Sequence, residues 1–257
     1  CGAIQKVLEG ITPASPICFK EPEPQFPGLA SIPVVIIDWP DKVEELKWPL
    51  ADHEDARLAF AELVTRSASF KLLAIKGNSE TGKSHLIEQF FNNARRRVKN
   101  CRCARFDFKG TDQIDQTLAT FVQDLGIPLP PAASSLSERL RNILHSLTQH
   151  QQPSLLIFDT YEDAGDAERW IQESLLSSLH LNDWLRVIVA GQKVPPRHGK
   201  LWDDDTKEII VAPPDPSHWH EYALANGRSM TLSFIEEAHN HTKGKASILA
   251  QLCGPHI

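Results

Sequence analysis

The sequence predicts an α/β fold in which a doubly wound, mainly parallel five-stranded sheet is followed by a small C-terminal helical annex. Short continuous apolar runs alternate with longer segments of helical periodicity, which is the pattern of strands joined by crossover helices. One run, 155–159, is apolar up to a final acid, as is typical of a parallel strand buried on both faces. After Pro213-Pro214 only helical patterns follow. We expect strands at 70–76, 103–108, 155–159, 185–190 and 208–211.

The expected helices follow from their start and stop signals. The acidic stretch 52–55 precedes a helix that includes Leu63, because negative charge stabilises a helix N-terminus. A helix over 112–125 ends at Gly126 with Pro128 beyond it, which is a usual helix stop. The other expected helices are 83–97, one from Ser135 or Ser137 to about Gln149, 167–180, 215–226 and 230–253, the last two separated by Asn226-Gly227.

These elements divide the chain into three expected parts. Residues 1–44 are rich in proline and have little periodicity, so we expect a linker or strap packed on the body. A short β-like run at 34–37 lies within this part. Residues 45–214 form the expected α/β core, and residues 215–257 form the helical annex.

Composition indicates an ordinary globular protein. The 257 residues are 41% hydrophobic and 23% charged, which suits one core domain with a small appendage. The net charge of −6 does not favour non-specific binding to nucleic acid or to an anionic membrane. We see neither an apolar run of membrane-spanning length nor a signal peptide, and an odd number of cysteines favours free thiols, so we expect a cytoplasmic protein. Met230 is the only methionine, from which we expect a piece of a longer protein.

The segment after strand 70–76 has the pattern Gly-x-x-x-x-Gly-Lys-Ser, placed between a strand and a helix. This is the P-loop (Walker A) pattern in its expected context. Gly77 and Gly82 let the backbone bend and approach a phosphate closely, and the loop N–H groups with the helix N-terminus attract an anion. Lys83 brings a positive charge to the β- and γ-phosphates, and the Ser84 hydroxyl is a ligand for Mg²⁺. The expected nucleotide-binding residues are Gly77, Asn78, Ser79, Glu80, Thr81, Gly82, Lys83, Ser84 and His85.

Polar residues at the ends of two later strands complete the expected site. Asp159 ends a buried strand, and open α/β sheets bind ligands beyond the carboxyl ends of their strands, so we expect Asp159 to hold Mg²⁺. Glu162 is expected to orient or deprotonate water, although it and Asp163 also suit a solvated loop or a helix cap. Gln192 follows the fourth strand, where it reaches the γ-phosphate or the attacking water, or else caps the strand. The catalytic candidates are therefore Lys83, Asp159, Glu162 and Gln192.

Together these segments resemble the nucleotide-binding core of the STAND class of P-loop NTPases, which are signal-transduction ATPases related to AAA+ and NACHT proteins. The resemblance covers about residues 45–254. It implies Lys83 and Ser84 on phosphate and Mg²⁺, Asp159 on Mg²⁺ and Glu162 near the water. The segments that carry it are Gly77–Ser84, Leu155–Glu162, Arg186–Gln192, Ile209–Pro213 with helix 215–226, and Thr242–Ala250.

Proteins of this class are switches with an ADP-bound resting form and an ATP-bound form that oligomerises, and their slow hydrolysis resets them. The resemblance therefore implies an ATP/ADP-binding regulatory module, with Mg²⁺, of a larger signalling protein of the bacterial defence or programmed-death type. Its implied partners are nucleotide, further copies of the chain, and effector or sensor domains fused outside this piece. The sequence has no guanine-reading Asn-Lys-x-Asp tetrapeptide, which favours ATP over GTP.

The resemblance also implies nucleotide contacts from residues 52–57 and from the annex, but two departures stand out. Family members often have arginine where Gln192 stands, so γ-phosphate sensing is expected to be weaker here. They often have Gly-x-Pro where this chain has Gly244-Lys245-Ala246, so contact between the annex and nucleotide is uncertain from the sequence.

Three other functions are compatible with a P-loop. A non-hydrolysing nucleotide-binding interaction module differs from the switch only in lacking turnover. A P-loop kinase or other transferase needs an acceptor site with arginines, for which the basic stretch 95–105 is the candidate, although cations are also favourable at a helix end. A DNA-acting AAA+ ATPase would use the same stretch, but the acidic balance and the lack of interleaved aromatics argue against it, so nucleic acid is an unlikely partner.

Overall fold

The computed structural model describes residues 39–43, 46, 48, 51–110, 114–131, 135–196 and 204–255. The strand-like run 34–37 and most of the predicted strap 1–44 lie outside these residues. Within the described ranges, no helix is long and apolar enough to span a membrane.

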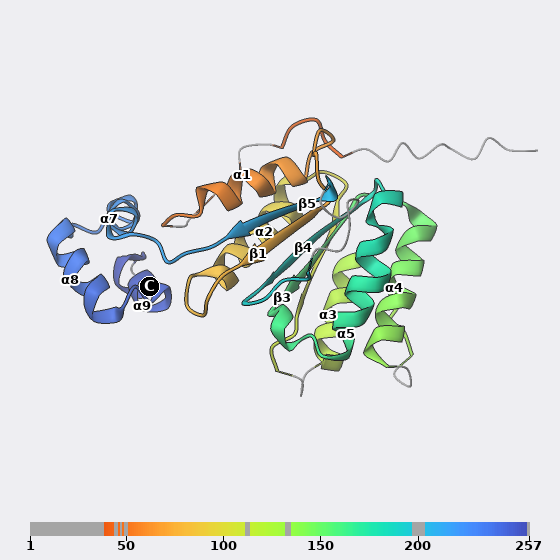
Figure 1. The fold of residues 1–257 in the computed structure, drawn as a ribbon. Coiled ribbons are helices and arrows are strands. Elements are labelled where there is room, and N and C mark those ends of the chain that lie inside the picture. The colour runs from red at the N-terminus through yellow and green to blue at the C-terminus, as the bar shows by residue number, and fades with distance from the viewer. Residues whose placement is uncertain are drawn as a thin grey trace, which may run out of the picture. The chain divides into compact units, whose positions relative to one another are not determined.

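The described residues form a five-stranded sheet with the order β2-β3-β4-β1-β5 (Figure 1). Every neighbouring pair of strands is parallel, which confirms the predicted doubly wound α/β core. The P-loop strand and the acidic strand are not neighbours, because β4 lies between them. The strands are β1 (Leu72–Lys76), β2 (Arg102–Asp107), β3 (Ser154–Asp159), β4 (Leu185–Gly191) and β5 (Thr206–Ile210).

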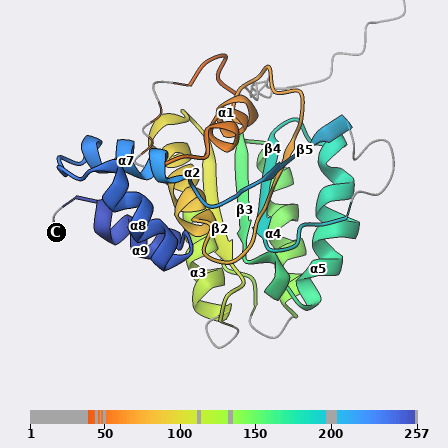
Figure 2. The ribbon, with the colours of Figure 1, turned by 60° about the vertical axis from the view of Figure 1, so that its left-hand side comes forward.

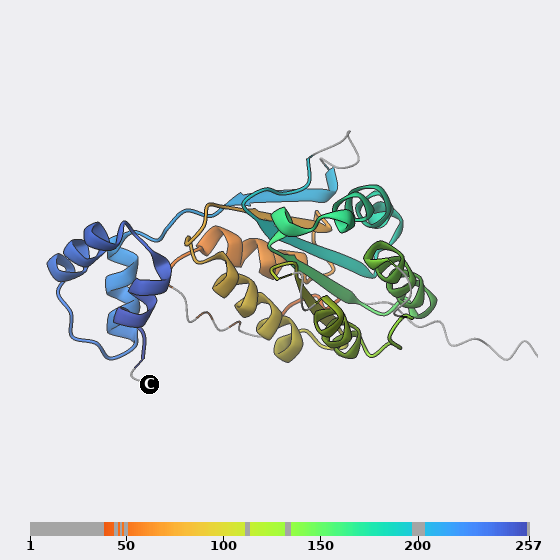
Figure 3. The same ribbon diagram turned by 90° about the horizontal axis from the view of Figure 1, so that it is seen from below.

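Helices cover both faces of this sheet (Figures 1 and 3). Alternate residues of β3 show why both faces are apolar: Leu155 and Ile157 belong to the core with α1 and α2, whereas Leu156 and Phe158 belong to the core with α3 and α4. The capping box of α4 confirms that this helix starts after Ser135. The helices named here are α1 (Glu54–Leu63), α2 (Lys83–Arg97), α3 (Ile114–Leu125) and α4 (Leu136–His150).

The helical segment predicted at 167–180 is present but not uniform. It begins as α5 (Asp166–Trp170), continues with i→i+5 hydrogen bonding as η3 (Ile171–Leu175) and tightens to a 3-10 helix as η4 (Leu176–Leu181). A further short 3-10 turn, η2 (Tyr161–Asp163), directly follows β3. This turn lifts the residues after Asp159 out of the sheet, so they line the site described below.

The predicted helix 230–253 is wrong, because the structure has two helices there. They are α8 (Leu232–Thr242) and α9 (Ala246–Cys253), which pack with α7 (Pro216–Ala225) around a small core of their own (Figure 2). Lys243 and Gly244 both have positive φ, at 55° and 71°, and Gly244 donates to the His239 carbonyl at 2.9 Å. This left-handed ending closes α8 and turns the chain before α9.

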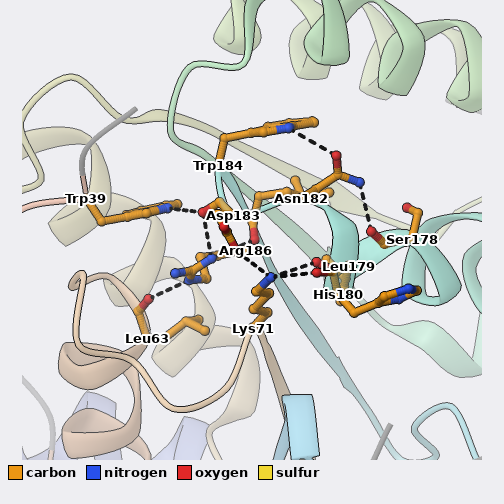
Figure 4. A network of polar contacts seen from close by, with 11 residues as sticks. Trp39, Leu63, Lys71, Ser178, Leu179, His180, Asn182, Asp183, Trp184 and Arg186 are labelled. Carbon is orange, nitrogen blue, oxygen red and sulfur yellow. Dashed lines mark hydrogen bonds and ion pairs between the residues drawn. The ribbon is translucent and has the colours of Figure 1, made fainter. Parts of the chain in front are cut away.

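A buried arginine organises the amino ends of the central strands (Figure 4). Arg186 is 5% exposed, and burial lowers its pKa to about 10, so it stays charged at neutral pH. Its guanidinium donates to the carbonyls of Asp183 (2.9 Å), Leu185 (3.1 Å) and Leu63 (3.3 Å). It also lies 5.0 Å from the centre of the Trp39 ring, whose indole N–H donates to Asp183. Arg186 therefore joins β4, α1 and the segment that contains Trp39.

We expect Arg186→Met to destabilise the fold by about 2 kcal/mol or more, because buried carbonyls lose a charged donor that a thioether does not replace. Urea unfolding followed by circular dichroism measures this loss. Arg169→Met is the control, because the Arg169 side chain is 83% exposed, and its unfolding midpoint is expected to match that of the unmodified chain. Equal midpoints for all three proteins would contradict the role of Arg186.

Candidate functional site

The P-loop leaves the sheet through a gap that admits no side chain. Gly77 follows β1, and its N–H donates to the Gly191 carbonyl at the end of β4 at 3.1 Å. On its other side, a Cβ on Gly77 would lie 2.5 Å from the Val211 carbonyl, which follows β5. Since neither contact is with the movable end of a side chain, glycine is required here.

The Lys83 side chain folds back onto the backbone of the loop. Gly82 has a φ of 93° and precedes Lys83, the first residue of α2. The Lys83 ammonium donates to the carbonyls of Gly77 at 2.7 Å and Asn78 at 2.5 Å. Burial lowers the pKa of Lys83, while Glu162 and Asp159 act in the opposite direction. The loop therefore holds a cation against neutral carbonyls, with both acids close enough to influence it.

A cavity of about 680 Å³ opens in front of this loop. It brings together the four catalytic candidates: Lys83 after the P-loop glycines, Asp159 at the end of β3, Glu162 after β3 and Gln192 after β4. Three of the expected nucleotide-binding residues, Gly77, Asn78 and Thr81, do not line it. Its walls are Ala51, His53, Ser79, Glu80, Gly82, Lys83, Ser84, His85, Lys109, Asp159, Thr160, Glu162, Asp163, Gly191, Gln192, Pro214, Trp219, Tyr222, Ala246, Ser247 and Ala250.

Asp159 is buried at the cavity floor, and each of its oxygens already accepts a hydrogen bond. Its Oδ1 accepts the Thr160 N–H at 2.9 Å, and its Oδ2 accepts Arg105 Nη2 at 2.6 Å. Burial raises the pKa of Asp159, while Arg105 acts to lower it. Among the described residues, no group of three or more His, Cys, Asp or Glu is placed to hold a metal ion. The Arg105 charge beside Asp159 makes this carboxylate a poor ligand for Mg²⁺ as arranged, and its metal role stays a prediction.

Glu162 and Gln192, predicted separately, are in direct contact. The Glu162 carboxylate accepts the Gln192 backbone N–H at 2.8 Å, while the Gln192 side chain is exposed at the cavity. A Cβ on Gly191 would meet both this carboxylate and, at 2.6 Å, the Lys193 carbonyl. Gly191 therefore lets the η2 turn approach the end of β4 closely, and this approach fixes the position of Glu162.

The annex contacts the P-loop directly. The Glu80 carbonyl accepts the Ala246 N–H at 3.1 Å, and the Glu80 carboxylate pairs with Lys245 at 3.1 Å. Glu80 itself has a φ of 65°, which is uncommon for a residue with a side chain. The sequence left contact by the annex uncertain because Gly-x-Pro is absent, but Gly244-Lys245-Ala246 still brings the start of α9 against the loop.

Sequence reasoning missed the aromatic wall of the cavity. Trp219 and Tyr222 of α7 meet edge to face, with ring centres 5.9 Å apart, and both line the cavity. The only signal was their spacing of three residues, which places two aromatics on one face of a helix. That spacing is equally typical of packing within a helical bundle, so it could not identify a site.

His53 is placed at the cavity by a left-handed backbone, with a φ of 75°, just before α1. Its Nε2 would lie 3.2 Å from a Cβ on Gly82, so the imidazole packs on the P-loop. Burial lowers the pKa of His53, while Asp52 acts to raise it. The segment 52–57, for which the resemblance implied nucleotide contact, therefore contributes at least this side chain to the cavity.

Comparison with known proteins finds solved structures of similar fold. No family model matches the sequence, and no curated protein matches it. A Signal Transduction ATPase with Numerous Domains from Pyrococcus horikoshii, which has a tetratricopeptide repeat sensor, matches with a TM-score of 0.50 and 13% identity over 83% of this chain and 31% of that chain. Cdc6p from Pyrobaculum aerophilum matches with a TM-score of 0.51 and 12% identity, over 83% of this chain and 68% of that chain. The FIGL-1 AAA domain, solved with ADP, matches with a TM-score of 0.50 and 17% identity, over 83% of this chain and 74% of that chain.

At these identities the likeness is one of fold. It shows that the core shares the fold of these three proteins, and the Gly77–Ser84 loop lies at the carboxyl end of β1. This chain spans about a third of the length of the STAND protein that it matches.

We expect His53 to make stability depend on pH. Its folded pKa is lowered, so the unfolded chain binds the proton first, and stability present above the ordinary pKa of 6.5 is lost as the pH falls toward the folded pKa. The thermal midpoint of the unmodified chain should therefore fall more on acidification from about pH 7.5 to about pH 5.5 than that of His53→Gln. His145→Gln, which changes an exposed histidine on α4, should keep the unmodified profile. Coincident profiles for His53→Gln and the unmodified chain would refute the expectation.

Proposed function

We propose that this chain is the nucleotide-binding module of a larger signalling protein, which binds ATP and ADP and changes conformation or oligomeric state between them. The observation that supports this most is the cavity in which the P-loop, the acidic end of β3 and the annex share one surface. A nucleotide held there touches the core and the annex at once, so its identity can influence how the two interact.

The P-loop supports binding of the phosphates. Lys83 now donates to two neutral carbonyls, and a phosphate beside the N-terminus of α2 would give it a charged partner. The loop N–H groups would act with it, because Gly77 and Gly82 allow close approach of the backbone. The exposed Ser84 hydroxyl lies on the same wall and is the residue best placed to meet a Mg²⁺ ion that arrives with the phosphates.

The annex supports binding of the base. Trp219 and Tyr222 form an aromatic wall, and Pro214, Ala246 and Ala250 extend it with apolar atoms. Such a wall suits a planar base, whereas the P-loop wall suits anionic oxygens. The cavity is therefore divided as a nucleotide is, with one polar end and one aromatic end.

Glu80 supports coupling of the P-loop to the annex. Its carbonyl and its carboxylate both bind the start of α9, through Ala246 and Lys245. A change in the loop caused by a γ-phosphate would shift these two contacts together. We infer that the ADP-bound form rests with the annex in place and that the ATP-bound form exposes surface for assembly with further copies.

Two contacts support slow hydrolysis. Glu162 accepts the Gln192 backbone N–H at one oxygen, Oε2, and Asp159 is paired with Arg105, so each carboxylate already has a donor that competes with an attacking water. The same contacts favour the second candidate, a nucleotide-binding interaction module without turnover. Turnover that survives Glu162→Gln would place the water-activating group elsewhere or favour that candidate.

Two arginines of the basic stretch 95–105 have partners within the core. Arg95 pairs with Asp124 of α3 at 3.1 Å and lies 5.2 Å from the centre of the Phe91 ring, while Arg102 donates to Gln152. These contacts give Arg95 and Arg102 structural partners, so neither arginine needs an acceptor molecule or DNA to explain its position.

The likeness to the STAND structure supports a place within a longer protein. That protein has a tetratricopeptide repeat sensor, and its match to this chain covers 31% of its length. The proposal therefore includes sensor or effector domains fused outside this piece. It also includes a cytoplasmic location and the assembly of ATP-bound copies.

We expect the purified chain to bind ADP and ATP in isothermal titration calorimetry, and Lys83→Ala to weaken binding by at least about tenfold, because the phosphates lose a charged donor. Lys42→Ala, which changes an exposed lysine, is the matched control and should bind as the unmodified chain does. Loss of binding in both variants, or in neither, would contradict a phosphate site at the P-loop.

The same preparations test the switch. We expect the sedimentation coefficient of the chain with ADP to differ from that with a non-hydrolysable ATP analogue, because the two forms are proposed to differ in conformation or oligomeric state. Binding of both nucleotides without any such difference would leave the nucleotide site in place and argue against switching by this piece of the protein.

A further inference from the structure

The acid expected to hold a metal ion is paired instead with an arginine of the neighbouring strand. Arg105 of β2 lies opposite Ile157 of β3, so it projects from the same face as Asp159, two residues along. Its Nη2 donates to Asp159 Oδ2 at 2.6 Å, and the Asp159 side chain is 3% exposed. A guanidinium at hydrogen-bond distance from a buried carboxylate neutralises much of its charge.

Other contacts hold this pair in position. Arg105 Nη2 also lies 3.6 Å from Asp107 Oδ2, and the other oxygen of Asp107 accepts the Thr160 hydroxyl at 2.7 Å and the Lys109 N–H at 3.0 Å. Thr160 in turn donates its N–H to Asp159. The ends of β2 and β3 therefore form one polar cluster, in which Arg105 interacts with both acids.

This cluster changes what the cavity offers a divalent cation. A cation beside Ser84 would face a carboxylate whose charge is already balanced and would be repelled by the nearby guanidinium. Lys83 bonds directly to the P-loop carbonyls of Gly77 and Asn78, and Arg105 acts on it only through the charge of Asp159. Arg105 therefore bears on metal binding more directly than on phosphate binding.

We propose that Arg105 neutralises Asp159 in place of a divalent cation, so that this chain binds nucleoside diphosphate with little dependence on Mg²⁺. The inference rests on the proposed function, because it concerns the nucleotide at that site. Arg105 is a positioning residue, since it acts through Asp159 and does not line the cavity.

Calorimetric titration with ADP, in Mg²⁺ and in EDTA, tests the inference. For the unmodified chain, the two dissociation constants should agree within about threefold. In Arg105→Gln, which keeps a hydrogen-bond donor but removes the charge, Mg²⁺ should tighten ADP binding by about tenfold or more, in the range by which residues around a metal site alter metal affinity. Arg105→Lys keeps the charge and should behave as the unmodified chain does.

A second readout follows the metal itself. With Mn²⁺ in place of Mg²⁺, electron paramagnetic resonance should detect more protein-bound Mn²⁺ with ADP in Arg105→Gln than in the unmodified chain. A dependence on Mg²⁺ of tenfold or more in the unmodified chain would overturn the inference, even if Arg105→Gln fails to fold. A weak dependence that persists in a folded Arg105→Gln would overturn the role of Arg105. Absence of ADP binding in both buffers would instead refute the proposed function.

Discussion

The close approach of three strand ends is the constraint on which the site depends. Gly77 lies between the Gly191 carbonyl, to which it donates, and the Val211 carbonyl, which leaves no room for a Cβ. Because β1 lies between β4 and β5, the P-loop can leave the sheet only through this gap. Gly191 repeats the constraint one strand further, where a Cβ would displace the Glu162 carboxylate. Backbone contacts across adjacent strands thus set the distances between the P-loop, Glu162 and Gln192.

The elements with local signals were predictable from the sequence. The apolar run that ends at Asp159, the Gly77–Ser84 pattern and the Ser135 cap each depend on residues close together in the chain, and each lies where it was expected. The break between α8 and α9 was not predicted. Lys243 has a left-handed backbone there, which is uncommon for lysine and so could not be predicted from the residue type. Gly244 was the available signal, and it was interpreted only as part of a family pattern.

The partners of the site residues could not be predicted in the same way. Asp159 meets Arg105 from 54 positions away, and Glu162 meets the Gln192 backbone from 30 positions away. Both contacts follow from strand order and register, which apolar periodicity does not determine. The sequence could place a carboxylate at a strand end, but the charge beside that carboxylate depends on which strand becomes its neighbour. The chemistry of an acidic strand end is therefore a property of the pair of strands.

The contacts set by strand order affect nucleotide binding and nucleotide hydrolysis differently in the proposed function. The proposed binding of phosphate would draw on Lys83 and on the N–H groups of the P-loop, so it would require little rearrangement of the core. Hydrolysis requires a carboxylate oxygen near the γ-phosphate that can accept from water. Asp159 has a hydrogen-bond donor on each oxygen, and Glu162 has one on Oε2. Freeing Oε2 of Glu162 requires breaking its hydrogen bond to the Gln192 N–H. Gln192 follows β4, which is the neighbour of β1 in the sheet. Under the proposed function, such a site would hold nucleotide with little rearrangement, and turnover would require the segments after β3 and β4 to shift, as expected of a slow switch.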